Sequence, residues 1–130
     1  MQILQPEGWA LTRGYAHGVV TSGRQVFISG QIGWDGQQRF VGTDFISQAA
    51  QALRNVVAVL EQAGGRPEHI VRMTWYVLDK REYVAAYREL GIAYREIMGA
   101  HYPAASAVQV AGLVEDLARV EIEATAVIPQ

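Results

Sequence analysis

The sequence contains no cysteine and only one lysine, Lys80, against ten arginines. Without cysteine the chain can form neither a disulfide nor a thiolate metal site, and it has no thiol nucleophile. The single lysine leaves one candidate for an amine nucleophile. The absence of cysteine is consistent with a reducing compartment.

Long apolar runs and clusters of basic residues are also missing. No apolar stretch approaches the length of a membrane span, and the amino-terminal segment MQILQPEGWALTRG lacks the basic start and apolar run of a secretory signal. The formal net charge is −2 and the cationic residues are scattered. This argues against nucleic acid as a partner, because such binders usually carry a basic stripe. We therefore expect a soluble, cytoplasmic protein without a membrane partner.

What is present is enough hydrophobic sequence for one core. The chain has 130 residues, of which 50% are hydrophobic, and a chain of this length usually forms a single domain. No linker, repeat or low-complexity tract divides it. We expect one domain spanning residues 1–130.

The clearest helix is predicted over residues 43–65. Its apolar residues recur at helical spacing, so one side should be buried. Thr43 or Asp44 can cap its start, and the Gly64-Gly65 pair ends it.

A second helix is predicted over residues 81–99, where tyrosines and aliphatic residues form a stripe. Gly91 lies inside this helix, although an interior glycine costs about 1 kcal/mol relative to alanine. We interpret Gly91 as a position that admits a close neighbour or tolerates nothing larger.

Strands are predicted before, between and after these helices. Residues 17–30 read as two short strands around a Ser22-Gly23 hairpin turn, and residues 70–79 are dense in β-branched and aromatic side chains. Two more strands follow, over residues 106–113 and 119–128, and the last alternates between apolar and polar residues.

The order ββ-α-β-α-ββ predicts an α+β fold, with a mixed sheet and two helices packed on one face. The other sheet face should mix apolar and polar groups, which favours oligomerisation. Its polar members are expected to include some of Arg72, Thr74, Tyr76, Gln109, Glu121 and Glu123.

The common motifs for phosphate loops, dinucleotides and zinc proteases are absent. The three histidines, His17, His69 and His101, lack ligand-like spacing, so we interpret them as surface or structural residues and expect no metal. Glu121 lies in the middle of the last strand. On a free face it points into solvent; at an interface it is desolvated, needs a partner and suits a general base.

Several segments in order resemble the RidA/YjgF family of reactive-intermediate deaminases. These are GYAHGV, VFISGQIG, QAAQALRNVVAVLEQAGG, IVRMTWYVLD, YPAAS and VEIEATA, which extend from about Gly14 to Ala126. The resemblance implies a chorismate-mutase-like fold and a homotrimer whose sheets line a barrel-like core. It also implies hydrolysis of imines and enamines such as 2-iminopropionate, in a pocket between subunits that uses no metal or cofactor.

The resemblance also implies roles for particular residues. The family tyrosine falls on Tyr15, the serine and glycine of its SGQ run fall on Ser29 and Gly30, and its acidic residue falls on Glu121. These positions resemble a hydroxyl and a backbone N–H around the substrate, and a carboxylate that positions or activates water. The alternative for Tyr15 and Ser29 is packing and turn formation.

Three positions depart from the family pattern. Active members carry P-A-R-[ST], in which the arginine pairs with the substrate carboxylate, but this chain has Ala105 at that position. Losing such a contact costs on the order of a hundred-fold in affinity. A frequent family asparagine falls on Gly91, and the usual S-Q after the tyrosine is replaced by Ala16-His17, which adds a titratable ring.

Two interpretations remain open at this stage. The chain is an imine hydrolase with an altered substrate range, for a bulkier and less anionic substrate whose acid group is absent or is held by His17, Arg72 or His101. Alternatively, it is a non-catalytic trimer that binds a small ligand or another protein. Endoribonuclease or translation-inhibitor activity, which has been attributed to some relatives, fits the acidic balance least well.

Overall fold

The computed structural model describes residues 1–130 and shows an α+β fold, which confirms the predicted class. Its elements are, in chain order, β1 (Gln2–Leu4), β2 (Gly18–Val20), β3 (Arg24–Gln31), α1 (Phe45–Glu61), the 3-10 turn η1 (Pro67–His69), β4 (Ile70–Val77), α2 (Lys80–Ala85), α3 (Tyr87–Met98), β5 (Ala104–Gln109) and β6 (Val120–Ile128). None of the three α-helices combines the length and hydropathy that a bilayer span requires.

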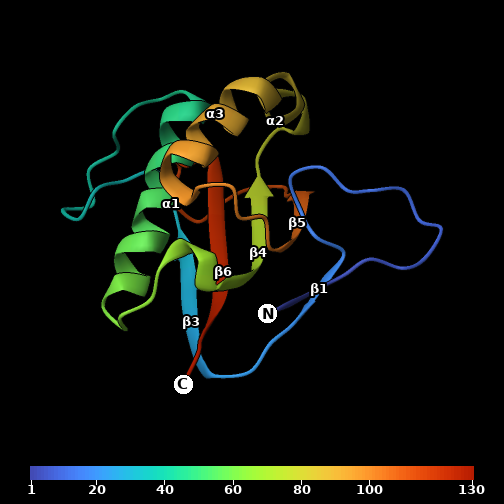
Figure 1. Ribbon diagram of the computed structural model, residues 1–130. Helices are drawn as coiled ribbons and strands as arrows, with labels where there is room; N and C mark the ends of the chain where they lie inside the picture. Colours follow the sequence, from blue (N-terminus) through green and yellow to red (C-terminus); the bar gives the residue numbers. More distant parts are fainter.

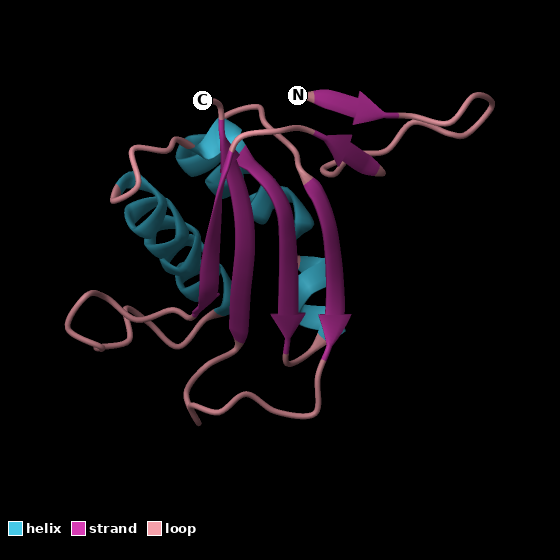
Figure 2. Cartoon of the chain, turned by 90° about the horizontal axis from the view of Figure 1, so that it is seen from below, coloured by secondary structure: helices cyan, strands magenta, loops and turns pink.

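The main sheet has four strands in the order β3-β6-β4-β5. β6 pairs antiparallel with both β3 and β4, whereas β5 pairs parallel with β4. The sheet is therefore mixed, as predicted. The helices lie on one side of it (Figures 1 and 2), and the parallel step from β4 to β5 passes through α2 and α3.

The predicted hairpin around Ser22-Gly23 is wrong. Both strands form, but β2 pairs with β1 in a separate two-stranded sheet, and β3 pairs with β6. The chain does bend at Gly23, whose φ of +149° lies in a region that glycine tolerates best. The three-residue β2 offers β3 a much shorter ladder than the nine-residue β6, so the long pairing dominates.

The second predicted helix is two helices, α2 and α3. The chain breaks at Ala86, whose φ of −95° and ψ of 4° are not helical. The tyrosine stripe nevertheless stays continuous across the break, because the Tyr83 and Tyr87 rings meet edge to face at 5.3 Å.

The first helix forms as predicted. The Asp44 side chain caps α1 by accepting a hydrogen bond of 2.9 Å from the Ser47 N–H. At the other end Gly64 adopts a left-handed φ of +80°, and the Gly65 N–H donates to the Leu60 carbonyl at 3.1 Å.

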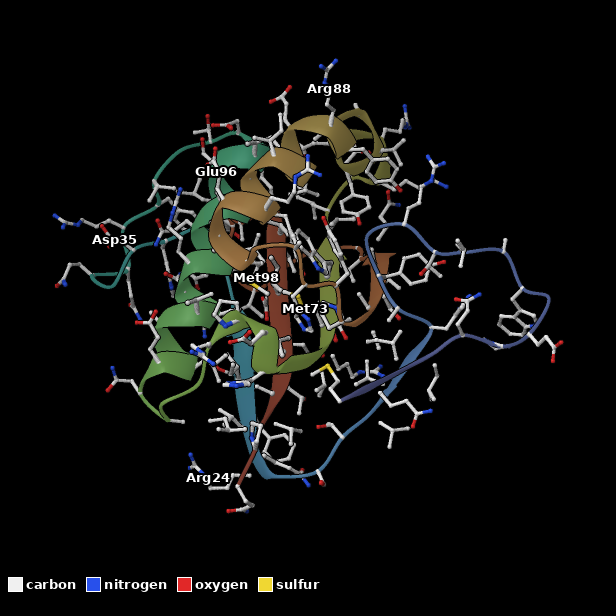
Figure 3. The ribbon with its side chains drawn as sticks, in the orientation of Figure 1. Arg24, Asp35, Met73, Arg88, Glu96 and Met98 are labelled. Atoms are coloured by element: carbon white, nitrogen blue, oxygen red, sulfur yellow. The ribbon has the colours of Figure 1, made fainter.

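The hydrophobic core lies between the helices and the sheet. β6 alternates strictly: Val120, Ile122 and the later even-numbered residues are buried, while the odd-numbered residues face the opposite side. Figure 3 shows Met73 of β4 in this interior, and 1% of Met73 is exposed. The one fully buried polar side chain of the core is Gln48, whose amide bonds the carbonyls of Gly42 and Leu117 and the N–H of Arg119.

No helix covers the opposite face of the sheet, called here the open face (Figure 2). It carries Arg72, Thr74, Tyr76, Glu121 and Glu123, paired in register across β4 and β6. This confirms the predicted mixture of groups. Apolar residues join them, and the most exposed is Phe27 of β3, at 73%.

Gln109 is the exception among the predicted open-face residues. It pairs in register with Val77, which is buried on the helix side. Its side-chain oxygen accepts a hydrogen bond of 2.8 Å from the Lys80 N–H, so Gln109 ties the end of β5 to the start of α2.

Candidate functional site

A cleft of about 760 Å³ lies between the β4–β5 half of the sheet and helices α2 and α3. Three of the predicted site residues line it: Tyr15, Gly91 and Ala105. The segment before β2 forms part of its wall, because this segment runs alongside β5 (Figure 1) and the Ala16 N–H donates to the Pro103 carbonyl at 3.0 Å. The cleft is thus assembled from segments far apart in the chain.

The YPAAS segment builds one corner of this cleft. Pro103 is buried, β5 begins at Ala104, and Ala105 pairs in register with the buried Met73. This register turns the Ala105 methyl group toward the helix side of the sheet. At the position where the resemblance implies a guanidinium, the cleft wall therefore carries a methyl group.

Aromatic side chains make up much of the remaining wall. They come from five segments and are Tyr15, Trp75, Tyr83, Tyr87, Tyr94 and Tyr102. The Tyr94 and Tyr102 rings stack with 5.2 Å between centroids and 9° between planes. Such rings offer flat apolar surface for another ring.

The hydroxyl of Tyr94 has a structural role. It donates a hydrogen bond of 2.6 Å to the His101 carbonyl, and burial raises the pKa of Tyr94 well above its usual value. Burial also raises the pKa of Tyr83. Both hydroxyls stay neutral at physiological pH and do not serve as bases.

Gly91 has open space on its cleft side. A β-carbon added there would meet no atom of the chain within 4 Å. The interpretation that a close neighbour excludes larger residues is therefore wrong for the single chain. The absent side chain leaves the cleft wider instead.

Ser29, Gly30 and Glu121 lie outside the cleft. They form a second group, on β3 and β6, where the pairing shifts register between Ile28 and Gln31. The Glu121 carboxylate lies directly over Gly30, and a β-carbon at residue 30 would overlap it. Gly30 is thus the residue that permits this position of the carboxylate.

Ser29 is exposed and borders a shallow hollow of the open face together with Arg72 and Glu123. Six of the seven predicted site residues therefore fall into two groups within one chain: Tyr15, Gly91 and Ala105 in the cleft, and Ser29, Gly30 and Glu121 outside it.

None of the three suggested replacements for the arginine lines the cleft. His17 packs edge to face against Trp9 at 4.9 Å, and Arg72 is on the open face. The His101 Nε2 lies 2.6 Å from the Ile70 carbonyl, to which it must donate because a carbonyl only accepts. His101 is thus structural, as the spacing of the histidines predicted.

Two cations that the sequence analysis did not assign to the site line the cleft, Arg13 and Lys80. Arg13 lies two residues before the predicted Tyr15, and Lys80 begins α2. Because Arg13 lies so near the predicted site residue Tyr15 in the sequence, a position beside the site could have been predicted for it. Nothing in the sequence pairs Lys80 with β5, because that contact depends on the fold.

No three His, Asp or Glu side chains come together in a cluster able to hold a metal ion. The chemistry available near the second group is that of a carboxylate, a hydroxyl and backbone N–H groups, which suits proton transfer to and from water.

Comparison with known proteins agrees with this fold and these motifs. The endoribonuclease L-PSP family profile matches residues 8–128. The chain is 38% identical to a 2-iminobutanoate/2-iminopropanoate deaminase of Salmonella typhimurium over 113 residues, which cover 87% of this chain and 86% of the relative. It is also 38% identical to a RutC family protein of Pasteurella multocida over 108 residues, covering 83% of each chain.

Solved structures show the same architecture over nearly the whole length. A Rid-family protein of unknown function from Yersinia pestis, YyfB, superposes with a TM-score of 0.85 at 32% identity and 98% coverage of both chains. The Escherichia coli protein TdcF, solved with bound serine, gives a TM-score of 0.71 at 33% identity and 97% coverage of both. The chain therefore belongs to the RidA/YjgF family, the family that the endoribonuclease L-PSP profile describes.

Proposed function

We propose that this protein is a cofactor-free imine or enamine hydrolase, acting on substrates bulkier than 2-iminopropionate. The observation that carries this proposal is the cleft at Ala105, where a methyl group and tyrosines replace the expected guanidinium. Its volume of about 760 Å³ is in the range that accommodates ligands of drug size. A three-carbon imino acid would fill only a small part of it and would lack the ion pair that the resemblance implies at position 105.

The active assembly in this proposal is a homotrimer. The two groups of site residues are separate within one chain, and the open face bears exposed apolar side chains beside Glu121 and Glu123. Burying that face against a second copy removes apolar area from water, which is favourable by about 25 cal/mol per Å². It also offers a way for Glu121 of one copy to complete the cleft of another.

The proposed reaction is a hydrolysis. Glu121 accepts a proton from water as the water oxygen adds to the imine carbon. Glu121 passes this proton to the imine nitrogen, which gives a carbinolamine. Glu121 then takes the proton of the carbinolamine hydroxyl and delivers it to the nitrogen as the C–N bond breaks, which releases the carbonyl product and ammonia. One water is consumed for each C=N bond converted to C=O. Tyr15 and the Gly30 N–H are placed in this scheme as groups that orient the substrate.

This proposal is tested with imines generated in situ by an amino-acid oxidase from a panel of amino acids, with semicarbazide trapping of the imine. We expect the protein to accelerate loss of the bulkier imines and to act little on 2-iminopropionate. Glu121→Gln should lower the accelerated rate by at least about a hundred-fold, the usual scale of acid–base catalysis. Glu96→Gln, at an exposed position of α3, is the matched control and should leave the rate unchanged.

Equal rates in wild type and Glu121→Gln would exclude this mechanism. If no imine in the panel is hydrolysed faster than in buffer, the non-catalytic ligand-binding trimer becomes the better account, because Ala105 removes the usual substrate contact. An endoribonuclease is disfavoured by the net charge of −2 and the absence of a basic stripe.

A further inference from the structure

The cleft is lined by two cations that form no ion pair with the rest of the chain. Arg13 and Lys80 are the only charged residues that line it. The three ion pairs of the chain lie elsewhere, and each joins other residues: Arg39 with Asp35, Arg66 with Glu68, and Arg119 with Glu82. Two unpaired cations beside a mostly apolar cavity attract an anion, because low-dielectric walls strengthen the field.

The rest of the cleft wall favours a ligand with an aromatic ring. Trp75, Tyr83 and Tyr87 follow one another along the cleft, with ring centroids 6.2 Å and then 5.3 Å apart. These spacings suit edge-to-face and offset aromatic contacts, which contribute beyond the apolar area that they bury. Tyr87 is more than half exposed, so its surface is available to a ligand.

We infer that the cleft binds an aromatic carboxylate, with its ring among the tyrosines and its carboxylate held by the guanidinium of Arg13. Arginine suits this role better than Lys80, because its planar fork can donate two parallel hydrogen bonds to a carboxylate. Lys80 adds attraction as a point charge. Arg13 thus supplies, from the segment before β2, the charge that Ala105 does not supply from β5.

This inference rests on the proposed function only for the reaction: the substrate is then a 2-imino acid with an arylalkyl side chain and the product the corresponding 2-keto acid. It differs from the sequence-based expectation of a less anionic substrate. The anionic group is retained, and its partner has moved to another segment of the chain.

Titration calorimetry with stable keto acids tests the binding step without turnover. The probes are phenylpyruvate, pyruvate, which lacks the ring, and phenylacetone, which lacks the carboxylate. We expect phenylpyruvate to bind at least about tenfold more tightly than either of the others. Arg13→Ala should weaken phenylpyruvate roughly ten- to a hundred-fold, and Arg13→Lys less, since lysine keeps the charge but not the fork.

Arg88→Ala is the matched control. Arg88 is an exposed arginine of α3 whose side chain points away from the body of the protein (Figure 3), and it does not line the cleft. Its removal changes the net charge as Arg13→Ala does, and phenylpyruvate affinity should not change. Tyr87→Ala should weaken phenylpyruvate and leave pyruvate unaffected. Circular dichroism verifies that each variant is folded.

Phenylpyruvate binding no tighter than pyruvate, or equal affinities in wild type and Arg13→Ala, would overturn the inference. The two proposals fail separately. If phenylpyruvate binds through Arg13 but no imine is hydrolysed, the inferred ligand class is supported and the proposed enzymatic activity is refuted. If Glu121→Gln abolishes hydrolysis and Arg13→Ala does not affect it, the proposed enzymatic activity is supported and the inferred ligand class is refuted.

Discussion

Ala105 presents a methyl group to the cleft, at the position where the resemblance to the family implies an arginine that pairs with the substrate carboxylate. This departure was visible in the YPAAS motif alone, because motif positions carry over without knowledge of the fold. Of the two cations that line the cleft, Arg13 could have been inferred from its place two residues before Tyr15, whereas Lys80 reaches the cleft only when the start of α2 is placed beside β5. At the residue scale, the motifs predicted the absent arginine, and the fold was needed to show that both cations line the cleft.

Gly91 gives a prediction of stability at this scale. Because open space surrounds its cleft side, Gly91→Ala should raise the free energy of unfolding by about 0.5–1 kcal/mol through helix propensity alone. Gly99→Ala is the contrasting variant: Gly99 has a φ of +73°, so alanine there should be destabilising. Urea unfolding at one fixed protein concentration measures both. A destabilised Gly91→Ala protein would show that something fills the space beside Gly91 in the assembled protein.

The elements divide into those specified locally and those decided by competition between strands. α1 carries its own cap and stop signals, and its start and end agree with the prediction. The break between α2 and α3 falls at Ala86, where no glycine or proline indicates the end of a helix, so the sequence did not predict it. The partner of β3 was equally hidden, because pairing with β6 rather than β2 depends on ladders between residues about a hundred positions apart.

The cap of α1 makes a prediction about acid stability. Hydrogen bonds from the Ser47 backbone and side chain lower the pKa of Asp44 below its ordinary value of 3.8. Because the pKa is lowered in the folded state, the ionised Asp44 carboxylate stabilises the folded protein above about pH 4. This stabilisation is lost as the pH falls through the folded-state pKa. At pH 7, Asp44→Ala should lower the free energy of unfolding by about 1 kcal/mol.

Asp44→Asn separates the cap from its charge, since asparagine still accepts from the Ser47 N–H but does not titrate. Urea unfolding between pH 7 and pH 3 should show wild type approaching Asp44→Ala at the acid end, with Asp44→Asn close to wild type at pH 7. A constant difference between wild type and Asp44→Ala across this range would contradict the titrating cap.

At the scale of the whole molecule, one face of the main sheet is covered by helices and the other face is uncovered. The helices bury one side of the sheet (Figure 2), while the open face retains Phe27 at 73% exposure beside a row of polar residues. The alternation of the last strand predicted this division correctly. It could not predict that the site residues would separate into two groups, since that depends on the strand order and on the path of the segment before β2.

The proposed homotrimer predicts the mass in solution. Light scattering should give three times the 14.3 kDa of one chain. Phe27→Asp should dissociate the assembly by placing a charge in the buried apolar face. Val59→Asp is the control, because Val59 lies on α1, on the other side of the sheet. A wild-type mass of one chain, or a Phe27→Asp mass equal to that of wild type, would refute the trimer.

The central claim is that alanine at position 105 redirects this family cleft from small to bulky imino acids. The most direct test compares hydrolysis of the imines of alanine and phenylalanine by wild type and Ala105→Arg, with Ala111→Arg, at an exposed position outside the cleft, as the control. We predict that wild type prefers the phenylalanine-derived imine and that Ala105→Arg raises kcat/KM for 2-iminopropionate on the order of a hundred-fold, while lowering it for the bulkier imine. Equal preference in wild type, with no change of preference in Ala105→Arg, would contradict the claim.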